Sequence, residues 1–155
     1  MHWTDIPTPV LDLLRAGTVI PAHPLALGEG SAMDTVRQRA LTRYYVDAGV
    51  GGEAVGVHTT QFEIRAPEHG LFEPVLRFSA EEVRRHLAPD RPFALIAGVC
   101  GKTAQAIEEA TLARDLGYDA VLLSLTALGG AMDAEQIEHC RRIGEILPLV
   151  GFYLQ

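Results

Sequence analysis

The stretch GVGGEAVGVHTTQFE, residues 49–63, decides how the rest of the chain is interpreted. Its first glycines end a helix-like pattern, and the apolar run Ala54–Val57 that follows carries no charge on either face. Such a run predicts a strand that is buried on both sides, as is typical of parallel sheets covered by helices. The predicted strand delivers His58, Thr59 and Thr60 at its carboxyl end, which is the edge of a parallel sheet where binding sites form.

The paired threonines of this stretch suit the binding of a carboxylate group. Thr59 and Thr60 together offer two hydroxyls and two backbone N–H groups, and all four can donate hydrogen bonds to carboxylate oxygens. The alternative interpretation is that both residues only form the turn that ends the strand. Spacing alone does not separate these two interpretations.

Composition and charge narrow the class of protein. The chain has 155 residues, of which 48% are hydrophobic and 21% charged, so we expect one globular domain over residues 1–155. The net charge of −7 argues against nucleic acid and anionic membranes as partners, because its field repels phosphate. Cys100 and Cys140 show no CxxC spacing, which argues against a disulfide framework or structural zinc. No secretory signal or membrane-spanning run is visible, so the expected location is the cytoplasm.

Apolar periodicity predicts alternating strands and helices. Residues 1–17 form an N-terminal extension whose helix covers residues 10–15 and ends at Gly17. The predicted strands cover residues 18–21, 54–57, 93–98, 119–125 and 149–153. The predicted helices cover residues 33–48, 71–87, 103–116 and 133–147, with Ile137 facing inward in the last. A capping-box pattern at Ser79–Glu82 suggests a break in the second of these helices near Phe78 and Ser79. This order predicts a parallel α/β fold built from βαβ units.

Two further patterns suggest sites but support them weakly. Gly101-Lys102-Thr103 ends like a phosphate loop, but the glycine required five residues earlier is Ile96, so the loop is too short to enclose two phosphates. We expect a strand-to-helix turn there, with Thr103 as the helix cap. His23, His58 and Cys100 each follow a predicted strand and form a workable ligand set for a soft metal. Their spacing gives no support, and we predict that no metal is bound.

Tyr153 is the second notable polar group, because it follows an apolar run at the end of the last predicted strand. A phenol hydroxyl in a pocket can transfer a proton to a bound carbonyl group, with a threonine hydroxyl as its neighbour. Thr59 or Thr60 is the candidate neighbour. The alternative is a core tyrosine whose hydroxyl is merely satisfied by a hydrogen bond.

Taken together, these motifs resemble the dihydrodipicolinate synthase / N-acetylneuraminate lyase family of class I aldolases. VGGEAVGVHTT at residues 50–60 is similar to the segment of that family that carries its paired threonines. Ala97-Gly98 followed by TAQAIEEA at 103–110, LGYDAVL at 116–122 and LPLVGFY at 147–153 resemble three further family motifs in the same order. The resemblance covers most of the chain from Thr18 onward.

The resemblance implies a (β/α)8 TIM barrel, of which this chain holds the N-terminal part with about the first five strands. It implies a Schiff-base lyase or aldolase that acts on a pyruvate-like keto acid, needs no cofactor, and forms homo-oligomers, as dimers or tetramers. Tyr153 and Thr59 take the catalytic roles, while substrate binding falls to Thr59, Thr60, His58 and His23. The Schiff-base lysine of the family lies on strand six, beyond residue 155, and the one lysine present is Lys102.

Some positions differ from the family motifs, so the substrate is left open. His58 replaces the glycine before the threonines, and Gln61-Phe62 replaces the Gly-Glu after them. Thr126–Leu128 stands where the synthases have Pro-Tyr-Tyr. Two alternatives follow: a family-like barrel without catalysis, or a flavodoxin-like binding or signalling module with strand order 2-1-3-4-5.

Overall fold

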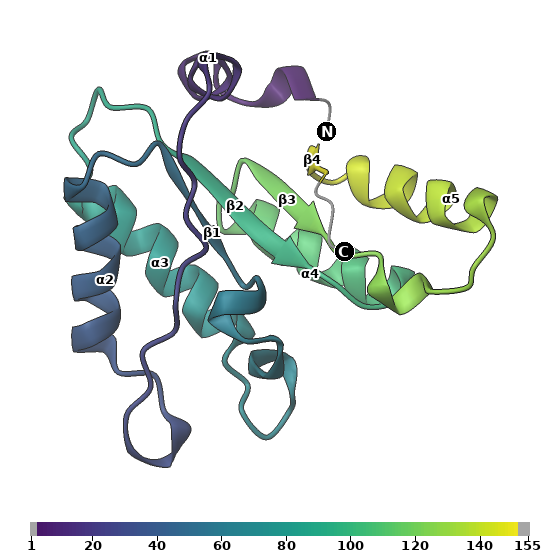
Figure 1. Ribbon diagram of the computed structural model, residues 1–155, viewed down its shortest axis with the longest axis horizontal. Coiled ribbons are helices and arrows are strands. Elements are labelled where there is room, and N and C mark those ends of the chain that lie inside the picture. Colours follow the sequence, from purple (N-terminus) through teal and green to yellow (C-terminus); the bar gives the residue numbers. More distant parts are fainter. Residues whose placement is uncertain (1–2, 152–155) are drawn as a thin grey trace.

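The computed structural model describes residues 3–151, and their strands form one parallel sheet (Figure 1). The strands lie in the order β1-β2-β3-β4, so each pairs with its neighbour in the sequence. Their bounds are β1 (Gly52–Val55), β2 (Ala94–Val99), β3 (Ala120–Leu123) and β4 (Leu149–Val150). The helices are α1 (Thr8–Ala16), α2 (Thr35–Asp47), α3 (Phe72–His86), α4 (Thr103–Asp115) and α5 (Asp133–Gly144). Short 3-10 turns, among them η3 (His58–Thr60) and η4 (Phe62–Arg65), fill the loops.

The predicted strand at residues 18–21 is not a regular strand. Pro21 and Pro24 lack the N–H groups that a ladder needs. The segment nevertheless runs beside β1, where the N–H of Ala54 donates to the carbonyl of Pro21 at 2.9 Å and the N–H of His23 donates to the carbonyl of Ala54 at 2.8 Å. It therefore extends the sheet on the outer side of β1.

The sheet order decides between the fold alternatives. In a flavodoxin-like sheet the predicted first strand, residues 18–21, would lie between β1 and β2, whereas β1 and β2 pair directly with each other and residues 18–21 run along the outer side of β1. The observed order follows the chain, as in a segment of a (β/α)8 barrel. The flavodoxin-like alternative is wrong. Of the predicted strand 149–153, β4 accounts for the first two residues, and residues 152–155 lie outside the described part.

The two faces of the sheet have different coverings. Helices α3 and α4 lie behind the sheet in Figure 1, and the larger apolar cluster joins them to strand residues such as Val55 and Val121. The opposite face packs against α1 through a smaller cluster that includes Val10 and Ile96. Alternate strand residues therefore enter different clusters, as the period of two requires.

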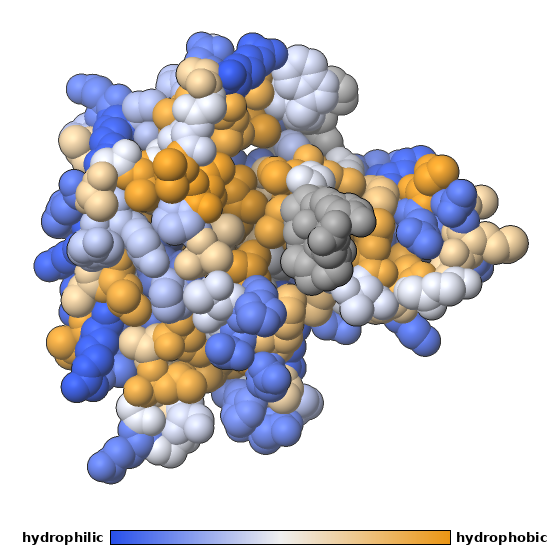
Figure 2. Space-filling view, in the orientation of Figure 1, coloured by the Kyte–Doolittle hydropathy of each residue, from blue (hydrophilic) through white to orange (hydrophobic). Residues whose placement is uncertain are grey.

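The face that carries α1 is buried over β1 and β2, while apolar residues at the two edges of the sheet stay partly exposed. Figure 2 shows hydrophobic residues gathered over the middle of this face. Val19 keeps 69% of its surface exposed, and Leu149 and Val150 on β4 keep 37% and 36%. The predicted burial of the apolar strands on both faces is therefore confirmed for β1 and β2, in which every residue is buried.

Two predictions about the helices are wrong. Helix α3 runs without a break through Phe78 and Ser79, because Ser79 is buried on the core side of the helix instead of capping a second one. In α5, Ile137 is 67% exposed, and the helix buries His139 and Ile143. Within residues 3–151, no helix has the length and apolarity that crossing a membrane requires.

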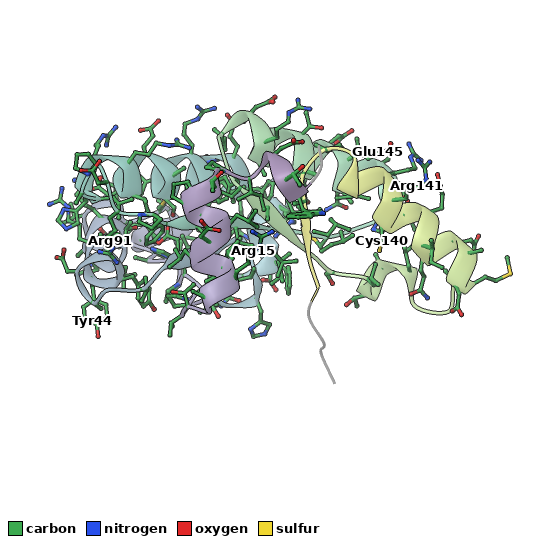
Figure 3. All side chains as sticks on the ribbon, turned by 90° about the horizontal axis from the view of Figure 1, so that it is seen from above. Arg15, Tyr44, Arg91, Cys140, Arg141 and Glu145 are labelled. Atoms are coloured by element: carbon green, nitrogen blue, oxygen red, sulfur yellow. The ribbon has the colours of Figure 1, made fainter. Side chains whose placement is uncertain are left out.

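Arg91 fixes the approach to β1. Its guanidinium donates to the carbonyl of Val46 in α2 and to the carbonyl of Val50, each at 2.6 Å. In Figure 3 it lies at the same end of the molecule as Tyr44 of α2. The end of α2 and the turn into β1 are therefore held together, and this sets the direction in which β1 carries the threonines.

Candidate functional site

The threonine loop is held in place by Thr60. This residue is fully buried, and its hydroxyl donates to the carbonyl of His23 at 2.7 Å while accepting from the N–H of Gly56 at 3.0 Å. The hydroxyl is therefore engaged within the fold. It ties η3 to the segment that runs beside β1, just past the carboxyl end of the strand.

Thr59 and His58 are exposed at the same turn. The Thr59 hydroxyl has no hydrogen-bond partner among the described residues, so it stays available to a ligand. The turn thus combines one fixed threonine with one free threonine. Tyr153 lies outside the described residues, and its convergence with Thr59 stays a prediction, as do the predicted roles of all five site residues.

His23 lies in the interior, not at the rim of a pocket. Its ring is fully buried, with Nδ1 at 2.8 Å from the carbonyl of Pro24 and Nε2 at 3.0 Å from the hydroxyl of Thr42. Burial lowers the pKa of His23 below its ordinary value of 6.5. The ring reaches no surface in this structure, so His23 acts on the threonine loop through its backbone carbonyl.

Glu53 on β1 is a buried carboxyl group that the sequence analysis did not single out. Its Oε2 lies 3.5 Å from Nε2 of His23, and neither of its oxygens has a hydrogen-bond partner among the described residues. Burial raises the pKa of Glu53 to about 8. The carboxyl group is therefore mostly protonated at neutral pH. In the sequence this buried group is indicated only by one acidic residue directly before the apolar run Ala54–Val57.

Arg65 joins the carboxyl ends of β1 and β2. Its Nη2 donates to the carbonyls of Gly56 and Gly98, at 3.1 and 2.9 Å, and its Nε donates to Glu109 at 2.9 Å. The other carboxylate oxygen of Glu109 accepts from the N–H of Cys100 at 3.1 Å. Strand β2, the η4 loop and α4 are fixed together at the edge of the sheet that carries the threonines.

The two strand ends approach closely beside Arg65. A Cβ on Gly98 would lie 2.4 Å from the carbonyl oxygen of Gly56, so only glycine fits there. Gly98 falls in one of the family-like motifs of the sequence, whereas Arg65 falls in none of them. Nothing in the sequence pairs Arg65 with Glu109, because they lie 44 residues apart.

Gln61 follows the threonines in a strained conformation. Its φ is 77° and its ψ is 132°, a backbone region that glycine adopts without cost. We expect Gln61→Gly to raise the free energy of unfolding by about 1 kcal/mol, since relief of strain outweighs the added chain entropy. Urea unfolding monitored by circular dichroism measures this. Gln61→Ala is the matched control and should bring no gain, and a less stable Gln61→Gly protein would contradict the assignment of strain.

The turn after β2 is an ordinary helix start. Thr103 is the first residue of α4, its hydroxyl pairs with Nδ1 of His139 at 2.9 Å, and the N-cap position predicted for it belongs to Lys102. Lys102 is exposed. In the part of the chain that the structure describes, no three His, Cys, Asp or Glu residues group in a way that could hold a metal ion. The absence of a metal stays a prediction.

Parallel strands in chain order, joined by helices and ending in polar loops at one edge, define a segment of a βα barrel. Solved structures share this fold. The chain is similar to a 4-hydroxy-tetrahydrodipicolinate synthase from Methylacidiphilum fumariolicum, with a TM-score of 0.74 and 18% identity over 89% of this chain and 44% of that one. An N-acetylneuraminate lyase from Mycoplasma synoviae matches with a TM-score of 0.71 and 19% identity, over 88% and 46% of the two chains.

A dihydrodipicolinate synthase from Oceanobacillus iheyensis matches with a TM-score of 0.71 and 21% identity, over 85% of this chain and 42% of that one. The chain thus has the fold of these barrel enzymes and spans less than half of their length. No protein-family model matches the sequence, and no curated protein matches it. The predicted α/β barrel fold is confirmed, and the activity is not shown by this likeness.

Proposed function

We propose that this chain forms part of a Schiff-base lyase or aldolase that acts on a pyruvate-like keto acid. The observation that carries the proposal is the threonine turn at the carboxyl end of β1. Thr60 is locked by two hydrogen bonds, and this fixes the neighbouring Thr59 as an exposed donor. A turn held in this way binds a carboxylate at little entropic cost, because the donors are positioned before the ligand arrives.

In this proposal the residues of the chain bind and orient the substrate and move protons. The Thr59 hydroxyl and the backbone N–H groups of the turn hold the carboxylate of the keto acid. Tyr153 transfers a proton to the carbonyl oxygen of the bound keto acid, the role that the family resemblance gives it. A homo-oligomer in the cytoplasm, with a small keto acid as its partner, belongs to the same proposal.

The carbonyl group also needs activation, which the threonine and tyrosine residues do not supply. An imine with a lysine provides it, and such a lysine needs a desolvated site that lowers its pKa. Lys102, the one lysine among the 155 residues, is exposed at the start of α4. The proposal therefore takes the Schiff-base lysine from outside residues 1–155.

The test is borohydride trapping with pyruvate, followed by intact mass measurement. The full reading frame should gain one reduced pyruvyl adduct that maps to a lysine outside residues 1–155, and the 155-residue chain alone should gain none. An adduct on Lys102 would show that the nucleophile is wrongly assigned. A full-length protein that binds keto acids without any adduct would instead support the non-catalytic barrel, which the missing aromatic residues at Thr126–Leu128 favour.

A further inference from the structure

A small cavity lies between two loops on the carboxyl side of the sheet. One loop leads from the segment beside β1 into α2, and the other leads from η3 into α3. The cavity has a volume of about 120 Å³. Its aliphatic wall includes Leu25 and Leu71, and its polar lining consists of Ser31, Gln61, Glu63 and His69. The threonine turn is not part of it.

The four polar side chains that line the cavity are exposed to solvent and have no protein partner within residues 3–151. No hydrogen bond or ion pair joins Ser31, Gln61, Glu63 or His69 through its side chain to any residue of the described range 3–151. The buried side chains of Arg65 and Glu109, by contrast, are paired with each other. The lining of the cavity is therefore free to serve a bound molecule.

Backbone strain marks the same cavity. Ser31 and Gln61 are the two non-glycine residues with positive φ between residues 3 and 151, at 60° and 77°, and both line this cavity. Glycine would adopt either conformation without a steric penalty. Strain of this kind concentrates at ligand-binding positions, where the side chain is worth more than the strain it causes.

Charge and shape select the class of ligand. Glu63 is the one acidic residue in the lining, and no lysine or arginine lines the cavity. Ser31 and Gln61 add oxygen acceptors, and the leucines offer an aliphatic surface. We propose that this cavity binds a small aliphatic amine in its ammonium form, with Glu63 as the counter-ion and the leucine wall against the hydrocarbon chain.

The size of the cavity limits the ligand. At roughly 30 Å³ for each water in the liquid, the volume corresponds to about four waters, and so to an amine of roughly four to six non-hydrogen atoms. A carboxylate on the ligand would face Glu63 with no lysine or arginine in the lining to compensate its charge. A zwitterionic amino acid should therefore bind no better than the simple amine.

An NMR titration of the ¹⁵N-labelled full chain with n-butylammonium chloride tests this proposal. We expect saturable shifts confined to residues 25–33 and 61–71, and none with butyrate or butanol at equal concentration. Glu63→Gln should weaken binding by about two- to fivefold, as expected for loss of a solvent-exposed ion pair. Glu68→Gln is the matched control, because this exposed carboxylate lies on the same loop outside the lining.

Gln61→Gly separates binding from folding, since it should stabilise the protein while weakening the amine complex. Three results would overturn the proposal: no saturable shifts, an equal response to butyrate, or equal losses from the Glu63 and Glu68 variants. Thr59→Ala should leave amine binding unchanged, so the cavity and the proposed keto-acid site are tested independently.

Discussion

Replacing Arg65 with methionine is expected to lower the free energy of unfolding by about 3–5 kcal/mol, because it leaves the Glu109 carboxylate buried without its cation. The two side chains keep only 10% and 7% of their surfaces exposed, so water cannot compensate for the loss. The substitution also removes two hydrogen bonds to the strand ends and the contact of the guanidinium with the ring of Phe72, whose centroid is 4.3 Å away. Urea unfolding provides the measurement.

A surface ion pair serves as the control for Arg65. Arg77 and Glu73 on α3 are 51% and 53% exposed, so Arg77→Met should cost less than about 1 kcal/mol. Combining Arg65→Met with Glu109→Leu should cost less than the sum of the single changes, because the double variant buries no lone charge. A loss below 1 kcal/mol for Arg65→Met would show that the pair does not hold the strand ends.

The protein should lose about 2 kcal/mol of stability between pH 6.5 and pH 8 because of Glu53. Burial raises the pKa of this carboxyl group from 4.5 to about 8, so the folded state binds its proton more tightly than the unfolded state does. The resulting stability is complete below pH 4.5 and is lost as the pH rises through about 8, at about 1.4 kcal/mol for each pH unit.

Two buried histidines affect the stability of the fold at pH values below this range of pH 6.5 to 8. Burial lowers the pKa values of His23 and His139, so they reduce stability only as the pH falls below their ordinary value of 6.5. Glu53→Gln should abolish the loss between pH 6.5 and pH 8, and Glu63→Gln, at an exposed position, should leave it intact. Thermal unfolding at constant ionic strength distinguishes these outcomes. A wild-type protein that gains stability towards pH 8 would show that Glu53 is ionised in the fold.

The sequence predicted the fold well because the fold depends on apolar runs and helix ends. Strands such as Ala94–Val99 are apolar throughout, and helix α4 ends within one residue of its predicted bound. The irregular segment before α2 was harder to predict, because β-prone residues there compete with two prolines. Ile137 was misplaced because helical spacing alone allows more than one face of α5 to be the buried one.

The site was predicted in part. The threonine turn can be predicted from its position after an apolar strand. The division into a buried, hydrogen-bonded Thr60 and an exposed Thr59 cannot. That division depends on the carbonyl of His23, which lies 37 residues from Thr60 in the sequence. Arg65 and Glu53 escaped notice for the same physical reason, since their partners come from distant segments that only the fold brings together.

The order of the sheet also bears on how the chain folds. Because every strand pairs with the next one in the sequence, each βα unit can dock on its predecessor without waiting for a distant segment. Each pairing joins residues one βα repeat apart, 42 positions for Gly52 and Ala94 and 24 positions for Ile96 and Ala120. The growing sheet can therefore be extended unit by unit from its amino-terminal side during synthesis on the ribosome, where amino-terminal parts emerge first.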